Sequence, residues 1–316
     1  MTCALTSTLR DYSTPNYLLI QDGKTLARQL KAIQATHLFG IDCETTGLDP
    51  KRDRIRLVQI AVPHTRVLLI DLFTIAPKHL KPLQQLLNSS ALKIGHNLKF
   101  EWQFLAQAGL GLAHPFFDTQ LAYRVWSAGI KTKLSLRSVA SKLLRVKLNK
   151  SLQHSNFGRA KLTSQQLRYA ATDAAILLDL YPILHGRLKQ SQLLEVARLE
   201  FSCIPVTAQM ELNGMLLDLS RWQGYGASLE KQKAAALAVV KQLSIPGKQQ
   251  LSLLPEITDT INPNSPKQLL AALQAIGAPI ESTSEKELVP LSGEFPVIQA
   301  LLDYRNSHVI GGSSSV

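Results

Sequence analysis

The sequence has few cysteines and lacks any long apolar run. Cys3, Cys43 and Cys203 show neither metal-ligand spacing nor a pairing pattern, so we expect no disulfide framework and a reducing, cytoplasmic setting. No stretch reaches about 18 consecutive apolar residues, the length that spans a bilayer. Residues 1–20 lack the basic start and apolar core of a signal peptide. These absences predict a protein without a membrane segment.

Acidic residues are scarce relative to basic ones. The 316 residues contain 35 Lys and Arg against 23 Asp and Glu, which gives a net charge of +12. A basic surface suits a polyanionic partner, because each neutralised phosphate releases counterions; a basic protein without such a partner is the alternative. Hydrophobic residues make up 45%, which indicates a globular chain with one large domain or two ordinary ones.

The first half of the chain predicts a layered fold of strands and helices. Short apolar runs predict strands at 37–42, 55–62, 67–72 and 92–96. Helical spacing of apolar residues predicts helices at 24–35 and 78–88, and a mainly helical stretch from residue 96 to residue 186. Strands followed by helices that pack on them indicate an α/β or α+β architecture.

The composition shifts near Gln190, and the remainder predicts a mainly helical region. The expected helices lie at 193–213, 227–243, 266–276 and 297–307. Ser265 is a candidate N-cap for the third of them. Residues 244–265 are rich in Pro, Ser and Asn and predict a loop, and the tail at 311–316 is expected to fray.

Asp42 and Glu44 stand two residues apart at the end of the first predicted strand. Residues two apart on a strand face the same side. Two neighbouring carboxylates repel, and each raises the pKa of the other unless a cation lies between them. Since oxygen ligands suit Mg²⁺ or Mn²⁺, the pair is a candidate metal site; an exposed acidic strand end is the alternative.

Three further acids and a tyrosine lie in helical settings. Tyr169 and Asp173 are four residues apart and share one face of a predicted helix. Glu101 falls in the first turns of a helix, where the helix dipole alone favours an acid. Asp118 could likewise be an N-cap. Each of these motifs alone therefore has a purely structural explanation.

Taken in order, the motifs resemble the three exonuclease motifs of the DEDD superfamily, tyrosine subtype. They are Asp-x-Glu-Thr at 42–45, Asn-x₃-Glu at 97–101 and Tyr-x₃-Asp at 169–173. Further stretches are similar to the approach to the third motif in ribonuclease D, Werner-type exonucleases and related proofreading domains, namely residues 134–139, 148–155 and 162–173. The resemblance covers about residues 30–190 and implies a ribonuclease H-like mixed sheet flanked by helices.

The second half resembles another class of protein. Residues 204–218 are similar to the segment that joins exonuclease to polymerase in family A DNA polymerases, and 262–270 and 301–305 resemble the thumb beyond it. Nothing resembles the palm or fingers. We therefore predict an exonuclease domain at 1–192 and a helical thumb-like remnant at 193–316, with a separate DNA polymerase chain as a candidate partner.

The resemblance implies phosphodiester hydrolysis with two divalent ions, Mg²⁺ or Mn²⁺. Asp42 would bridge both ions, while Glu44 and Asp173 would complete the site of the ion that carries the attacking water. Glu101 would serve the second ion, at the leaving 3′ oxygen. Tyr169 would orient the water, because a phenol with a pKa of about 10 is a poor base at neutral pH. Nucleoside 5′-monophosphates would leave from a 3′ end.

The resemblance also marks residues for substrate binding. Leu48 matches the position of an apolar wedge between the terminal bases. Positions near the terminal nucleotide are matched by Thr45, His96, Asn97, Phe100 and Asp118. Basic residues near the motifs could follow the phosphates, with solvated loop charges as the alternative; they are Lys51, Arg52, Arg54, Lys131 and Lys133.

One residue departs from the superfamily, which usually has Asp where this chain has Glu101. The longer side chain moves the carboxylate by about 1.5 Å. This shift is tolerable if the contact to the second ion runs through water, whereas in a direct contact a misplacement of about 1 Å can cost about a hundredfold in rate.

Three functions stay open. The polymerase-like second half favours a 3′–5′ exonuclease acting on single-stranded or frayed DNA ends. The alternatives are a ribonuclease D-like enzyme that trims RNA and a non-catalytic nucleic-acid-binding or polymerase-accessory module.

Overall fold

The computed structural model describes residue 12 and residues 14–146, 155–244 and 261–311. The chain divides into two units, residues 1–214 and 215–316, and each is described by itself. The predicted boundary at residue 192 lies earlier in the chain. The difference arises because α7 (Leu194–Asn213) packs within unit 1, on α3 (Leu98–Gln107) and β6 (Phe116–Asp118).

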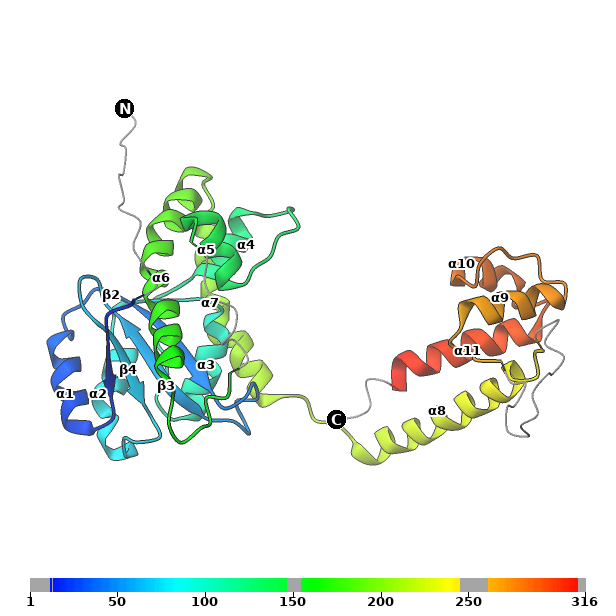
Figure 1. Cartoon of the computed structure of the whole chain (residues 1–316), viewed down its shortest axis with the longest axis horizontal. Coiled ribbons are helices and arrows are strands. Elements are labelled where there is room, and N and C mark those ends of the chain that lie inside the picture. The colour runs from blue at the N-terminus through cyan, green and yellow to red at the C-terminus, as the bar shows by residue number, and fades with distance from the viewer. Residues whose placement is uncertain (1–11, 13, 147–154, 245–260, 312–316) are drawn as a thin grey trace. The chain divides into compact units, whose positions relative to one another are not determined.

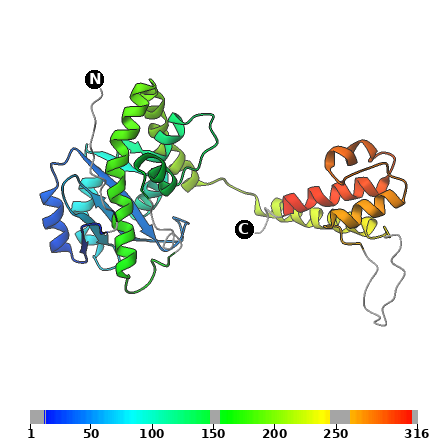
Figure 2. The same cartoon turned by 45° about the horizontal axis from the view of Figure 1, so that its top comes forward.

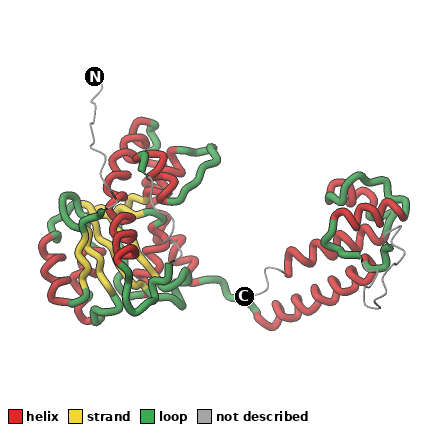
Figure 3. Tube along the Cα trace, in the orientation of Figure 1, coloured by secondary structure: helices red, strands yellow, loops and turns green. Residues whose placement is uncertain are grey.

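Unit 1 is built on a six-stranded mixed sheet with the strand order β1-β4-β3-β2-β5-β6. β2 pairs antiparallel with β3 and parallel with β5, and β5 pairs parallel with β6. The carboxyl ends of β2, β5 and β6 therefore meet at one edge, the place where open α/β sheets bind ligands. The strands, drawn in yellow in Figure 3, are β1 (Tyr17–Ile20), β2 (Leu38–Thr45), β3 (Ile55–Ala61), β4 (Val67–Asp71), β5 (Leu92–Gly95) and β6.

Helices cover both faces of the sheet (Figures 1 and 2). On one face, α1 (Gly23–Ala32) and α2 (Lys81–Leu87) pack against apolar side chains of β2, β3 and β4. α6 (Ser164–Gln190) crosses the other face, where its alanines pack against Leu57 and Leu69. The unit also contains η1 (Pro77–His79), α4 (Thr119–Trp126) and α5 (Leu136–Leu144). The predicted mixed sheet flanked by helices is confirmed.

The predicted strands and helices of the first half are present, with their ends shifted by a few residues. β1 and β6 were not predicted. They span four and three residues, and each pairs with a strand elsewhere in the sequence. So few residues carry too short a hydrophobic pattern to predict a strand. Of the predicted stretch at 148–155, all but the last residue lies outside the described ranges.

Unit 2 is helical, as predicted. α8 (Leu219–Val240) begins before the predicted residue 227, because the side chain of Asp218 caps it. The predicted N-cap Ser265 is confirmed, since its side chain accepts from the backbone N–H of Gln268. The other elements are α9 (Pro266–Ala275), α10 (Glu285–Leu288), η2 (Val289–Leu291) and α11 (Pro296–Gly311).

Several expectations on the whole chain can be checked only in the described ranges. Cys43 and Cys203 are unpaired, whereas Cys3 lies outside those ranges. No described helix is long and apolar enough to cross a membrane. Most of the predicted loop at 244–265 and nearly all of the predicted tail also lie outside.

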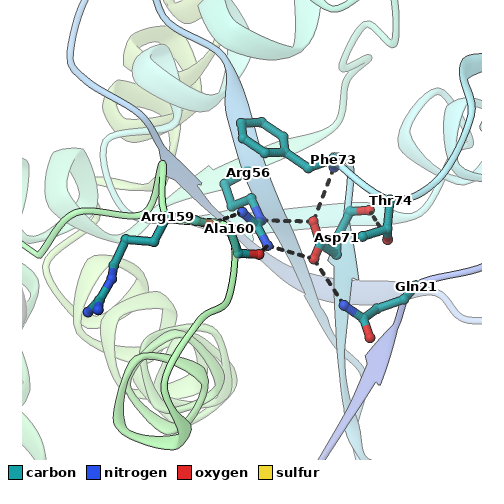
Figure 4. Close-up of polar contacts among 7 residues, drawn as sticks. All are labelled: Gln21, Arg56, Asp71, Phe73, Thr74, Arg159 and Ala160. Atoms are coloured by element: carbon teal, nitrogen blue, oxygen red, sulfur yellow. Dashed lines mark hydrogen bonds and ion pairs between the residues drawn. The ribbon is translucent and has the colours of Figure 1, made fainter.

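A buried ion pair attaches the chain before α6 to the sheet (Figure 4). The side chains of Arg56 and Asp71 are only 3% and 1% exposed, and their Nε and Oδ1 atoms are 2.9 Å apart. Arg56 also donates to the carbonyl oxygens of Arg159, at 2.5 Å, and Ala160, at 3.4 Å. Asp71 accepts from the backbone N–H of Phe73 at 3.1 Å. Such a pair survives burial because its other polar atoms are also bonded.

Removing one member of this pair should destabilise unit 1. Asp71→Ala leaves the Arg56 charge buried without its partner, which costs about 3–5 kcal/mol in comparable cases. The double variant Arg56→Met/Asp71→Leu removes both charges and should recover much of that loss. Urea unfolding of the three proteins measures both effects. An unchanged urea midpoint for Asp71→Ala would contradict the expectation.

Candidate active site

β2 directs two carboxylates toward α6. In the β2–β3 ladder, Asp42 lies opposite Gln59 and Glu44 lies opposite Leu57, and directly opposed residues share one face of a sheet. Leu57 belongs to the cluster that packs against α6. The predicted common orientation of Asp42 and Glu44 is therefore confirmed, and the face they share is the one that α6 crosses.

Gly40 allows α6 to approach β2 closely. It precedes Asp42 by two residues and so lies on the same face. A Cβ atom at residue 40 would lie 2.8 Å from the carbonyl oxygen of Ala174 in α6, closer than real Cβ contacts allow. The glycine thus determines how near the helix can come, and Asp173, the neighbour of Ala174, is brought to Asp42 by this contact.

Burial and mutual repulsion dominate the electrostatics of the site. Burial, with the charge of Asp173 added, raises the pKa of Asp42 to about 8. Burial also raises the pKa of Glu44 and of Glu101 well above their usual range, and the charge of Asp42 reinforces both shifts. The carboxylates of all three predicted motifs therefore lie within electrostatic reach of one another.

Asp173 has partners that favour its charged form. Burial raises its pKa to about 6, and this rise is opposed by a hydrogen bond from Tyr169 and by the charge of Arg137. Burial and the nearby carboxylates raise the pKa of Tyr169, so its hydroxyl stays protonated and donates. Arg137, in α5, was not predicted as a site residue, although it lies in the Leu134–Val139 stretch that carries part of the resemblance.

Glu101 lies buried at the start of α3 with an unsatisfied oxygen. Its side chain is 3% exposed, and Oε2 has no hydrogen-bond partner in the described ranges. A buried acid without a donor is costly unless a proton or a cation accompanies it. A set of four carboxylates, one with an orphaned oxygen, is chemically suited to a hard divalent cation.

The four carboxylates do not yet form a closed ligand shell. Among the described residues, no group of three or more His, Cys, Asp or Glu side chains is already arranged to hold a metal ion. The residues fit a divalent cation by their chemistry.

Asp118 and His96 connect the elements around Glu101. The Asp118 carboxylate accepts from four backbone N–H groups, those of Asn97, Leu98, Gln120 and Leu121, at 2.7–3.2 Å. It therefore caps α4, as one reading of the sequence predicted, and holds the start of α3. The ring of His96 lies between Thr119 Oγ1, at 2.9 Å, and the carbonyl oxygen of Leu134, at 2.8 Å. Burial lowers its pKa.

The other residues predicted to bind substrate lie around the carboxylates in less buried positions. Leu48 is 84% exposed, as an apolar wedge requires. The Thr45 hydroxyl donates to the carbonyl oxygen of Gly47 at 2.5 Å. Asn97 begins α3 with a left-handed backbone conformation, and the ring of Phe100 lies 4.7 Å from that of Phe104. The predicted phosphate-contacting residues are exposed, namely Lys51, Arg52, Arg54, Lys131 and Lys133.

Comparison with known families shows the family to which the chain belongs. The family described as 3′-5′ exonuclease matches residues 17–189, more than half of the chain. The chain belongs to this family and is a 3′–5′ exonuclease, a hydrolase. The family depends on a divalent metal.

Its relatives include DNA polymerases and ribonucleases. The chain is 30% identical over 225 residues to DNA polymerase I of Aquifex aeolicus, which covers 66% of this chain and 37% of that protein. It is 28% identical over 178 residues to ribonuclease D of Haemophilus influenzae, covering 56% and 43%. DNA polymerase I of Pseudomonas aeruginosa matches at 25% identity over 92% of this chain and 34% of its own length. The chain thus spans less than half the length of these relatives.

The chain is also similar to solved structures. NrnC of Brucella melitensis bound to pGG is 28% identical with a TM-score of 0.56, covering 64% of this chain and 95% of that one. NrnC with bound Mg²⁺ is 29% identical with a TM-score of 0.51. The POL domain of Pol1 from M. smegmatis, in complex with DNA primer-template and dNTP, shares the fold over 93% of this chain and 49% of its own, with a TM-score of 0.69 at 22% identity.

Enlarging Gly40 should separate Asp173 from Asp42. In Gly40→Ala the new methyl group would meet backbone rather than a flexible side chain, so α6 must shift. We expect exonuclease activity to fall by about a hundredfold or more, with a destabilisation of about 1–3 kcal/mol from overpacking. Gly186→Ala is the matched control, because a Cβ atom there meets open space within the same helix. Full activity of Gly40→Ala would contradict this account.

The metal-free protein should lose stability as the pH rises. Asp42 has a pKa of about 8 when folded against 3.8 as its ordinary value, so the folded state holds the proton more tightly. The stability that Asp42 contributes through this proton is fully present below about pH 4 and is lost as the pH rises toward 8. Asp42→Asn removes this dependence and should stabilise the protein in EDTA by roughly 1–3 kcal/mol at pH 8, but hardly at pH 4. If the free energy of unfolding changed with pH in the same way for the wild type and Asp42→Asn, this prediction would be refuted.

Proposed function

We propose that this chain removes nucleoside 5′-monophosphates from the 3′ end of single-stranded or frayed DNA. The observation that carries the proposal is the cluster of four carboxylates from three separate motifs, of which Glu101 is buried and Asp42, Glu44 and Asp173 are partly buried. The preference for DNA is supported by the extent of the matches. The DNA polymerase I match covers 92% of this chain and continues into unit 2, whereas the ribonuclease D match covers 56%.

The carboxylates would hold two divalent ions, Mg²⁺ or Mn²⁺, and they are Asp42, Glu44, Glu101 and Asp173. Bound there, the ions would lower the pKa of a water molecule and offset the charge on the leaving 3′ oxygen. The hydroxyl of Tyr169 would orient the water, because its raised pKa keeps it a donor. The water oxygen would bond to phosphorus as the bond to the 3′ oxygen breaks, and that oxygen would take up a proton.

Several residues would bind the substrate around this centre. The exposed Leu48 would insert beside the terminal base, and Thr45, Asn97 and Phe100 would contact the terminal nucleotide. His96 and Asp118 would act through position, because their polar atoms are already bonded to the protein. The exposed basic residues would contact phosphates in the strand that leads to the site.

A ribonuclease D-like activity on RNA is the second candidate. It is favoured by the 28% identity to ribonuclease D over 178 residues. A separate DNA polymerase chain stays a proposed partner, because two of the relatives are DNA polymerases.

Parallel assays on labelled oligonucleotides distinguish these functions. With Mn²⁺ or Mg²⁺, we expect single-nucleotide shortening from the 3′ end, faster on single-stranded DNA than on RNA of the same sequence. Asp173→Ala should lower the rate by about a thousandfold or more, on the scale of other residues that act in chemistry. Faster trimming of RNA would favour the second candidate. A wild type as inactive as Asp42→Ala would favour the accessory role.

A further inference from the structure

One buried amide near the carboxylates is left without partners. Gln59, in the centre of β3, is wholly buried, and neither Nε2 nor Oε1 has a hydrogen-bond partner in the described ranges. Burying an amide unpaired is unfavourable. Gln166, which is also buried, differs in this respect: its Nε2 donates to Ser155 Oγ at 2.6 Å and its Oε1 accepts from the Thr163 N–H at 3.0 Å. Packing therefore does not explain a glutamine at residue 59.

Strand register places this amide beside Asp42. The two residues are directly opposed in the β2–β3 ladder, and Cβ atoms of opposed residues lie about 4.5–5.5 Å apart on one face. On its other side Gln59 is opposed by Leu69 of β4. Leu57 and Ala61, which share its face of β3, pack under the alanines of α6. Among its ladder partners, Asp42 is the polar one.

We propose that Gln59 is a positioning residue for Asp42, and this proposal rests on the proposed metal-dependent function. When Asp42 is ionised and holds a cation, the Nε2–H of Gln59 donates to its carboxylate and fixes its orientation. A neutral amide is suited to this role, because it supports the negative charge without competing with the cation, as Lys or Arg would. Partners that hydrogen-bond a ligating carboxylate typically contribute about 10–100-fold to metal affinity or activity.

Gln59→Met tests the proposal, because methionine has a similar size and no hydrogen-bonding amide. In EDTA the variant should unfold at the same or a higher temperature than the wild type, since it no longer buries an unpaired amide. The Mn²⁺ concentration that gives half of the metal-induced rise in melting temperature should increase about 10–100-fold. The rate of hydrolysis at low Mn²⁺ should fall by a similar factor and recover in part at high Mn²⁺.

Two further variants separate positioning from packing. Leu69→Met changes the opposite neighbour of Gln59 without touching Asp42, and its Mn²⁺ dependence should match that of the wild type. In an Asp42→Asn background, Gln59→Met should cause no further loss of residual activity, because its effect passes through Asp42. Gln59→Leu is the replacement if the methionine variant does not fold.

The outcomes distinguish this inference from the function on which it rests. If the wild type shows neither Mn²⁺-dependent stabilisation nor hydrolysis, the proposed function fails and the role of Gln59 fails with it. If both are present in the wild type and lost in Asp42→Asn, but unchanged in Gln59→Met and Gln59→Leu, only the role of Gln59 is refuted. An equal loss in the Asp42→Asn background would also refute it.

Discussion

The contact between α6 and β2 at Gly40 is the constraint on which the active site depends. Asp42 and Glu44 come from a strand, whereas Tyr169 and Asp173 come from a helix more than a hundred residues later. They meet because the backbone of α6 passes over residue 40, where a Cβ atom would lie 2.8 Å from a carbonyl oxygen. The buried Arg56–Asp71 pair holds the residues that lead into α6 against β3. Together these contacts fix the place of the helix.

The same contacts gather groups that oppose folding. Burial raises the pKa of Asp42, Glu44, Glu101 and Asp173, so each is destabilising when ionised at neutral pH. Gln59 adds a buried amide without a partner. The surrounding apolar core and the bonded Arg56–Asp71 pair offset these costs. Polar and charged groups that are unfavourable at their positions are expected at functional sites, because apolar residues at the same positions would pack at a lower cost in free energy.

Sequence patterns predicted the parts of this molecule that are local, and they missed those that depend on distant partners. The apolar run ending at Asp42 predicted β2, while β1 and β6 are too short to show without β4 and β5 beside them. The set of four carboxylates was predicted from motif order and resemblance. Arg137 and Gln59 were not predicted, because their importance depends on Asp173 and Asp42, which only the folded chain brings near them. The boundary at residue 192 moved for the same reason: α7 looks like the start of a new region but packs on α3.

The packing of α7 on α3 affects Glu101, whose side chain is one methylene longer than the Asp that the superfamily usually has. Lys99 and Gln103 are four residues apart and share one face of α3, whereas Glu101 lies two residues from each, about 200° around the helix. Glu211 of α7 accepts from Gln103 Nε2 at 2.8 Å and from Lys99 Nζ at 2.6 Å. α7 therefore holds the face of α3 that points away from Glu101. The position of the Glu101 carboxylate therefore depends on where this contact sets the helix as well as on the added methylene.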